Sequence, residues 1–100
     1  MHDQQSLRYQ SAPIAEANRL AGLGTQLVDV RERNEFAYGS LPGALNLPLS
    51  ELATRYNEIN ADSPVALLCR SGARSAQAAE FLIDRGYPDV TNLDGGMLAA

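Results

Sequence analysis

The sequence predicts an α/β domain with a mainly parallel sheet that is covered by helices on both faces. Short apolar segments alternate along the chain with segments of helical periodicity, and glycine or proline residues separate them. The length of 100 residues is sufficient for one domain with one core. We expect residues 1–10 to be a flexible polar lead-in and residues 11–100 to form the domain.

In the first half of the chain, we expect a helix to start at residues 11–13, where a serine precedes a proline. Segment 26–30 is expected to be a short strand, followed by a helical turn over 32–38. Segment 41–48 contains two prolines and is compatible only with a brief edge strand. Residues 50–57 are expected to form another helix. The apolar face of the first helix would consist of Ile14, Ala17, Leu20 and Ala21.

In the second half, segment 64–68 is continuously apolar and is expected to be a buried strand. A helix would follow from residue 76 and stop at 86–88, before a last strand over 90–93. Ligands of parallel sheets bind beyond the carboxyl ends of the strands. Asp29, Cys69 and the 95–96 turn all follow such an end, so we expect the site there.

The composition excludes several classes of function. A net charge of −4 argues against nucleic acid as the main partner, and no apolar run is long enough to indicate a membrane. All eight basic residues are arginine, which excludes lysine-based catalysis. The only histidine, His2, lies in the expected lead-in, so neither a cysteine–histidine dyad nor a metal site is expected. A single cysteine fits a reducing, cytoplasmic setting.

The main candidate for chemistry is Cys69, on a short loop between the 64–68 strand and the next helix. A lone cysteine at a strand end is commonly an inert apolar residue, but the core does not require the nearby Arg70, Gly72 and Arg74. A free thiol has a pKa of about 8.5, and backbone N–H groups or guanidinium charges lower it. Gly72 permits a positive φ and a close approach of the backbone. We therefore expect an activated thiolate.

The remaining residues of this loop suit the same purpose. Ser71 and Ala73 are small and would leave the mouth of the loop open to a ligand. Ser75 is expected to cap the following helix, and we expect its hydroxyl also to donate toward the sulfur. Residues 70–75 are therefore expected to bind substrate and to stabilise an anion on Cys69.

Four segments, in order, resemble a single-domain rhodanese, which is a sulfurtransferase. They are residues 27–36, 39–48, the loop 69–75 and the Asp-Gly-Gly turn 94–96. The resemblance implies a doubly wound domain with a central parallel sheet of about five strands. It also implies that Cys69 takes a sulfane sulfur from a donor such as thiosulfate, carries it as a persulfide without any cofactor, and passes it to cyanide or a thiol.

Loop length distinguishes two branches of this resemblance. Sulfurtransferases use a cysteine and an arginine separated by four residues, whereas related phosphatases and arsenate reductases have a longer loop that fits a tetrahedral oxyanion. Cys69 and Arg74 have the shorter spacing. A smaller ring of amides suits one sulfur anion better than a phosphate.

Supporting roles are expected for charged residues around the loop. Arg70 would attract an anionic donor. Arg74 would turn inward and brace the loop against Asp29 or Glu35. Asp29 and Arg31 are expected to form a buried ion pair below the site, with direct catalysis as the alternative.

Three functions stay open at this point. The first is a free-standing sulfurtransferase, and the second is a sulfur-carrier module for a thioredoxin-like or sulfur-relay protein partner. The third is a phosphatase-like or non-catalytic domain, which the short loop and the presence of Cys69 disfavour.

Overall fold

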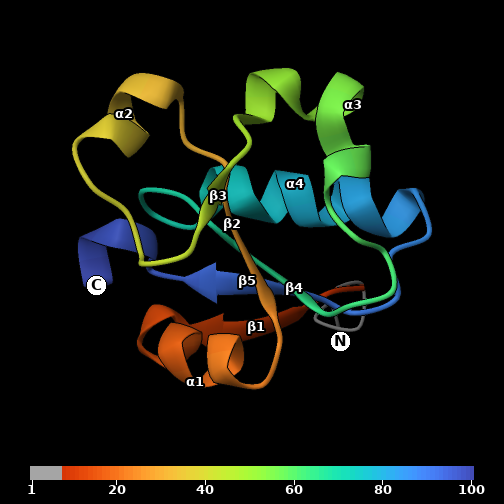
Figure 1. Ribbon diagram of the computed structural model, residues 1–100, viewed down its shortest axis with the longest axis horizontal. Helices are drawn as coiled ribbons and strands as arrows, with labels where there is room; N and C mark the ends of the chain where they lie inside the picture. The colour runs from red at the N-terminus through yellow and green to blue at the C-terminus, as the bar shows by residue number, and fades with distance from the viewer. Residues whose placement is uncertain (1–7) are drawn as a thin grey trace, which may run out of the picture.

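The computed structural model describes residues 8–100 and contains one parallel sheet. The strands lie in the order β1-β5-β4-β2-β3, and every neighbouring pair is parallel (Figure 1). Their bounds are β1 (Gln10–Pro13), β2 (Gln26–Asp29), β3 (Leu45–Asn46), β4 (Val65–Leu68) and β5 (Val90–Asp94). The expected α/β class is confirmed, as is the brief edge strand in segment 41–48.

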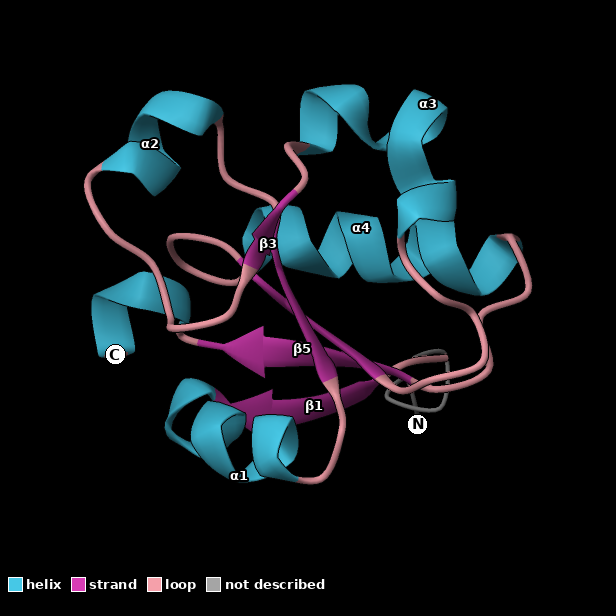
Figure 2. Ribbon diagram, in the orientation of Figure 1, coloured by secondary structure: helices cyan, strands magenta, loops and turns pink. Residues whose placement is uncertain are grey.

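Helices cover both faces of this sheet (Figure 2). The helix α1 and the 3₁₀ turn η5 pack on one face, and α3 and α4 pack on the other. The α-helices are α1 (Ala17–Gly22), α2 (Arg33–Ala37), α3 (Leu52–Arg55) and α4 (Ala73–Asp84). The 3₁₀ turns are η2 (Ile14–Glu16), η3 (Leu49–Glu51), η4 (Tyr56–Glu58) and η5 (Gly96–Ala99).

The central strand β4 explains why the apolar run 64–68 has no polar alternation. Its residues are all buried, because helices lie on both sides of the sheet. Val65 and Leu67 face the α4 side, whereas Ala66 and Leu68 face the α1 side. Cys69 continues the first of these rows and faces α4.

The expectation of a helix start at residues 11–13 is wrong. These residues belong to β1, which pairs with β5 at the edge of the sheet, and the helical part begins with η2. Pro13 has φ −66° and ψ 148°, an extended conformation that delays the helix. Three of the four residues of β1 are exposed, so the strand carries no apolar pattern. Of the expected lead-in, residues 1–7 lie outside the described residues.

The longest helix among residues 8–100 is α4, with 12 residues. None of the described helices has the length and apolar composition needed to cross a membrane.

Candidate active site

Cys69 lies directly beyond the carboxyl end of β4, as the sequence predicted. Residues 70–72 separate it from the start of α4, and the N–H groups of Ser71 and Gly72 are among those that stabilise its sulfur. Gly72 has φ +111° and ψ −12°, a left-handed conformation that favours glycine. The backbone N–H of Gly72 donates a hydrogen bond to Sγ of Cys69 over 3.0 Å.

Ser75 does not cap α4, contrary to the expectation. The N-cap position is Gly72, and Ser75 lies inside the first turn, fully buried. Its Oγ is 3.4 Å from Sγ of Cys69. The expected proximity of this hydroxyl to the sulfur is therefore present, but no side chain of residues 8–100 caps α4.

Opposing effects act on the ionisation of Cys69, which is only 1% exposed. Burial raises the pKa of the thiol, since it penalises the thiolate. The hydroxyl of Ser75 and the backbone N–H groups of Ser75, Gly72 and Ser71 act in the opposite direction. Together they outweigh burial, so the pKa of Cys69 lies below its ordinary value. The site can thus hold a sulfur anion without a basic side chain as proton acceptor.

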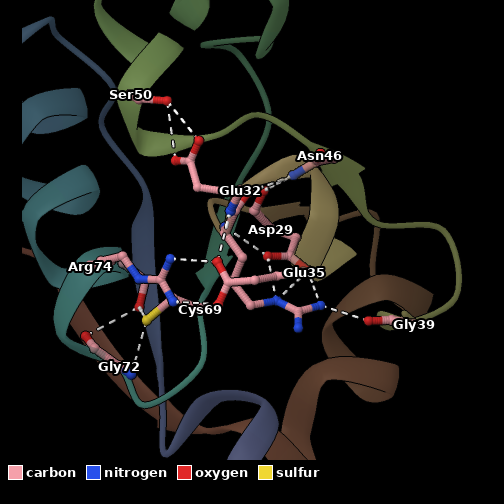
Figure 3. A network of polar contacts seen from close by, with 11 residues as sticks. Asp29, Glu32, Glu35, Gly39, Asn46, Ser50, Cys69, Gly72 and Arg74 are labelled. Carbon is pink, nitrogen blue, oxygen red and sulfur yellow. Dashed lines mark hydrogen bonds and ion pairs between the residues drawn. The ribbon is translucent and has the colours of Figure 1, made fainter. Parts of the chain in front are cut away.

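Arg74 turns inward and binds Glu35 of α2, one of its two expected partners (Figure 3). The two hydrogen bonds of the pair measure 2.7 and 2.9 Å. Glu35 also accepts the N–H of Glu32 over 3.0 Å, which closes the start of α2. The hydrogen bond to Glu35 raises the pKa of Arg74 most, and the charge of Cys69 adds a smaller effect in the same direction. Arg74 therefore couples the loop to α2.

The Glu35–Arg74 pair makes the stability of the domain depend on pH. The hydrogen bond from Arg74 lowers the pKa of Glu35 from 4.5 to about 2. A carboxylate with a lowered pKa stabilises the fold above pH 4.5, and this contribution disappears as the pH falls toward 2. Glu35→Gln should cost about 1 kcal/mol near neutral pH, since the pair is partly exposed to solvent.

Thermal unfolding of the parent and of Glu35→Gln between pH 7 and pH 2.5 measures this effect. The difference in unfolding free energy should shrink as the pH falls. Asp62→Asn is the control, because Asp62 is exposed and its carboxylate has no ion pair within residues 8–100. A difference that stayed constant with pH would contradict the assignment.

Asp29 and Arg31 form the expected buried ion pair, at the end of β2. Asp29 is fully buried and accepts hydrogen bonds of 2.8 to 3.1 Å from the backbone and guanidinium of Arg31. Ser40 donates to the same carboxylate over 2.7 Å, and Arg31 donates to the carbonyl of Gly39 over 2.6 Å. Asn46 of β3 donates to the carbonyls of Asp29 and Arg31. The polar contacts of Asp29 and Arg31 thus join β2, β3 and the 39–40 turn, which indicates a structural role.

The mouth of the loop is formed by Arg70, Ser71 and Ala73, all exposed. The side chain of Arg70 makes no ion pair or hydrogen bond with any residue between 8 and 100. Because Arg74 is paired with Glu35, Arg70 is the loop arginine whose charge, within the described part of the chain, is free to attract an anion.

The sequence did not single out Asn92, and for Gly96 it predicted only that the 95–96 turn lies at this end of the sheet. Asn92 lies buried in β5 and contacts both Ser75 and Gly72. Gly96 lies against the backbone of Cys69, and the N–H of Met97 donates to the carbonyl of Cys69 over 2.9 Å. Segment 90–93 contains two polar residues, Thr91 and Asn92, and no sequence pattern distinguished Asn92 from Thr91.

The sequence matches the family described as "Rhodanese-like domain" over residues 14–99. The chain therefore belongs to the rhodanese-like domain family, and the resemblance of the four segments is confirmed. A protein of Bacillus subtilis described as uncharacterized protein YqhL is 51% identical over 71 residues, which are 71% of this chain and 56% of that protein. A protein named sulfurtransferase from Allochromatium vinosum is 48% identical, over 73% of this chain and 68% of the relative.

Solved structures are similar over about nine-tenths of this chain. A rhodanese-like domain protein from Staphylococcus aureus superposes with a TM-score of 0.82 at 32% identity, covering 90% of this chain and 89% of that one. The human single-domain sulfurtransferase TSTD1 superposes with a TM-score of 0.76 at 29% identity, covering 92% and 93% of the two chains. The sheet and helices described above are the rhodanese fold.

Proposed function

We propose that this protein is a sulfurtransferase that uses Cys69 as its nucleophile. The observation that carries the proposal is the contact of Sγ with the N–H of Gly72 and its proximity to the hydroxyl of Ser75. These groups stabilise an anion on sulfur, and the thiolate is the nucleophilic form of cysteine. Relatives named sulfurtransferase support the same chemistry.

The proposed reaction has two displacements. With thiosulfate as donor, the Cys69 thiolate attacks the outer sulfur, a new S–S bond forms, and sulfite leaves with the electron pair of the broken bond. The persulfide carries one negative charge on its outer sulfur, near the N–H groups of loop 70–75. Cyanide or a thiolate then attacks that outer sulfur, and the Cys69 thiolate is released. The two displacements need no cofactor and no external oxidant.

Arg70 is the residue that we propose to attract the anionic donor, because its guanidinium is exposed and unpaired among the described side chains. Cys69 is almost fully covered, so the donor must displace part of the loop to reach Sγ. Because the side chains of Ser71 and Ala73 are small, they hinder this movement of the loop little. A reducing compartment such as the cytoplasm suits a protein that works through one free thiol.

Sulfur carriage for a protein partner is the second candidate. A relative from Bacillus subtilis named putative sulfur carrier protein YrkF is 37% identical over 71 residues. The chemistry at Cys69 would be the same, with a protein thiol, for example of a thioredoxin-like protein, in place of a small acceptor. Comparing turnover with cyanide and with a reduced protein thiol separates the two candidates.

The test of the proposed function is intact mass after incubation with thiosulfate. The parent protein should gain the mass of one sulfur atom, and the gain should disappear on treatment with cyanide or a thiol reductant. Cys69→Ser should show no gain. Hydrolysis of an aryl phosphate should be absent; if the protein hydrolysed the phosphate ester and took up no sulfur, the proposal would be wrong.

A further inference from the structure

The hydroxyl of Ser75 has one proton and three possible acceptors. Its Oγ lies 2.5 Å from Oδ1 of Asn92, 3.2 Å from the carbonyl oxygen of Gly72 and 3.4 Å from Sγ of Cys69. A hydroxyl donates one hydrogen bond at a time. The proton on Ser75 can therefore serve the sulfur only when it leaves the other two acceptors.

The orientation of the Asn92 amide is determined by its other contact. Its Nδ2 donates to the carbonyl oxygen of Gly72 over 3.2 Å, which leaves Oδ1 facing Ser75. The reverse orientation would place two oxygens against each other at Gly72 and an amide N–H against the hydroxyl. Asn92 and Ser75 are both nine-tenths or more buried, so the Ser75 hydroxyl cannot donate to solvent water instead of to Oδ1. Oδ1 of Asn92 therefore always faces the Ser75 hydroxyl as a hydrogen-bond acceptor.

We infer that Asn92 is a positioning residue that competes with Cys69 for the hydroxyl proton of Ser75, so that this proton follows the charge on Sγ. When Sγ is neutral, the hydroxyl donates to Oδ1 of Asn92. When Sγ is a thiolate, the hydroxyl turns and donates to it. This inference rests on the proposed function only where it is extended to the persulfide.

The sulfur-transfer cycle contains both states of Sγ. Before attack, Sγ carries the negative charge, and a charge-assisted hydrogen bond from Ser75 stabilises it. After the new S–S bond forms, the charge lies on the outer sulfur and Sγ becomes neutral. The hydroxyl then returns to Asn92. Asn92 thus lowers the cost of removing charge from Sγ, which favours loading of the sulfur.

The other charged groups around Cys69 do not provide such a switch. Arg70 follows in the loop and is exposed, and Arg74 of α4 is paired with Glu35 of α2. Asp29 at the end of β2 is paired with Arg31, and Asp94 at the end of β5 is exposed. The only charged residue of η3 is Glu51, which pairs with arginines, and η5 has none.

The test measures the pKa of Cys69 from the pH dependence of its alkylation by iodoacetamide, in the full chain without any sulfur donor. Cys69 is the single cysteine, so the signal is unambiguous. The variants are Asn92→Leu, which is nearly isosteric and lacks the acceptor, Ser75→Ala, and the double variant. Ser75→Thr is the matched control, because it keeps the hydroxyl.

Asn92→Leu should lower the pKa of Cys69 when Ser75 is present. This lowering should exceed the effect of the same substitution in the Ser75→Ala background by about half a unit to one unit. General effects of the substitution, such as a changed polarity, occur in both backgrounds and cancel. The Ser75→Thr background should behave like the parent. An equal shift with and without the hydroxyl, or a smaller lowering with it, would overturn the inference.

A second variant keeps the test valid if Asn92→Leu does not fold. Asn92→Asp offers Ser75 a charged and therefore stronger acceptor, so it should raise the pKa of Cys69 more with Ser75 present than in the Ser75→Ala background, where only the charge acts. An equal or smaller rise with the hydroxyl present would contradict the competition. Because these titrations use no donor, they remain informative if Cys69 takes up no sulfur. Sulfur uptake by the parent, measured separately by mass, decides the proposed function.

Discussion

Gly96→Ala is expected to disrupt the active-site loop and to abolish most sulfur loading. A Cβ at this position would lie 2.3 Å from the carbonyl oxygen of Cys69 and 2.7 Å from the carbonyl of Arg70. These carbonyls accept hydrogen bonds from the N–H groups of Met97 and Leu98. Either η5 or the loop must therefore move, at a cost of about 2–4 kcal/mol of unfolding free energy.

Gly86→Ala is the matched control for that variant. Gly86 also has a positive φ, +93°, but a Cβ there would meet nothing within 4 Å. It should show the backbone cost of a positive φ alone and retain sulfur loading. Urea unfolding and intact mass after thiosulfate measure both effects. Equal behaviour of the two variants would mean that the contact of η5 with the loop is unimportant.

Asp29→Ala is expected to destabilise the domain by about 3–5 kcal/mol, because it leaves the Arg31 guanidinium buried without its partner. The side chain of Arg31 is 9% exposed and that of Asp29 is 0% exposed. The double variant Asp29→Ala/Arg31→Met should recover part of the loss, since it removes the unpaired charge. Glu16→Ala, which breaks the exposed pair with Arg19, should cost well under 1 kcal/mol.

Denaturant unfolding measures those differences, and sulfur loading at low temperature tests the alternative role. We assign Asp29 a structural role in joining β2, β3 and the 39–40 turn, so the folded fraction of each variant should still accept sulfur. A stable Asp29 variant that fails to load would assign this residue a direct part in catalysis.

Much of this site followed from local sequence, because a strand end, a glycine and a helix start are adjacent in the chain. The position of Cys69 and the left-handed Gly72 are of this kind. The partner of Arg74 was not predictable in the same way, since Asp29 and Glu35 both lie about 40 residues away along the chain. Only the folded structure shows that Glu35 of α2 comes within hydrogen-bond distance of Arg74.

The errors have physical reasons. The strand β1 lies at a sheet edge and has little buried apolar surface, so the serine and proline at 11–13 suggested a helix. Ser75 has the residue type of a cap, but the left-handed Gly72 already reverses the chain, and the hydroxyl is buried against the sulfur and β5. Asn92 gains its role from the sheet order, which places β5 beside β4.

The rate of sulfur uptake as a function of pH tests the central claim most directly, because it reports ionisation and sulfur transfer at the same atom. With thiosulfate as donor and intact mass as readout, the rate should rise with a midpoint below the value of about 8.5 for a free cysteine. A midpoint at or above that value, or no uptake at any pH, would contradict the account.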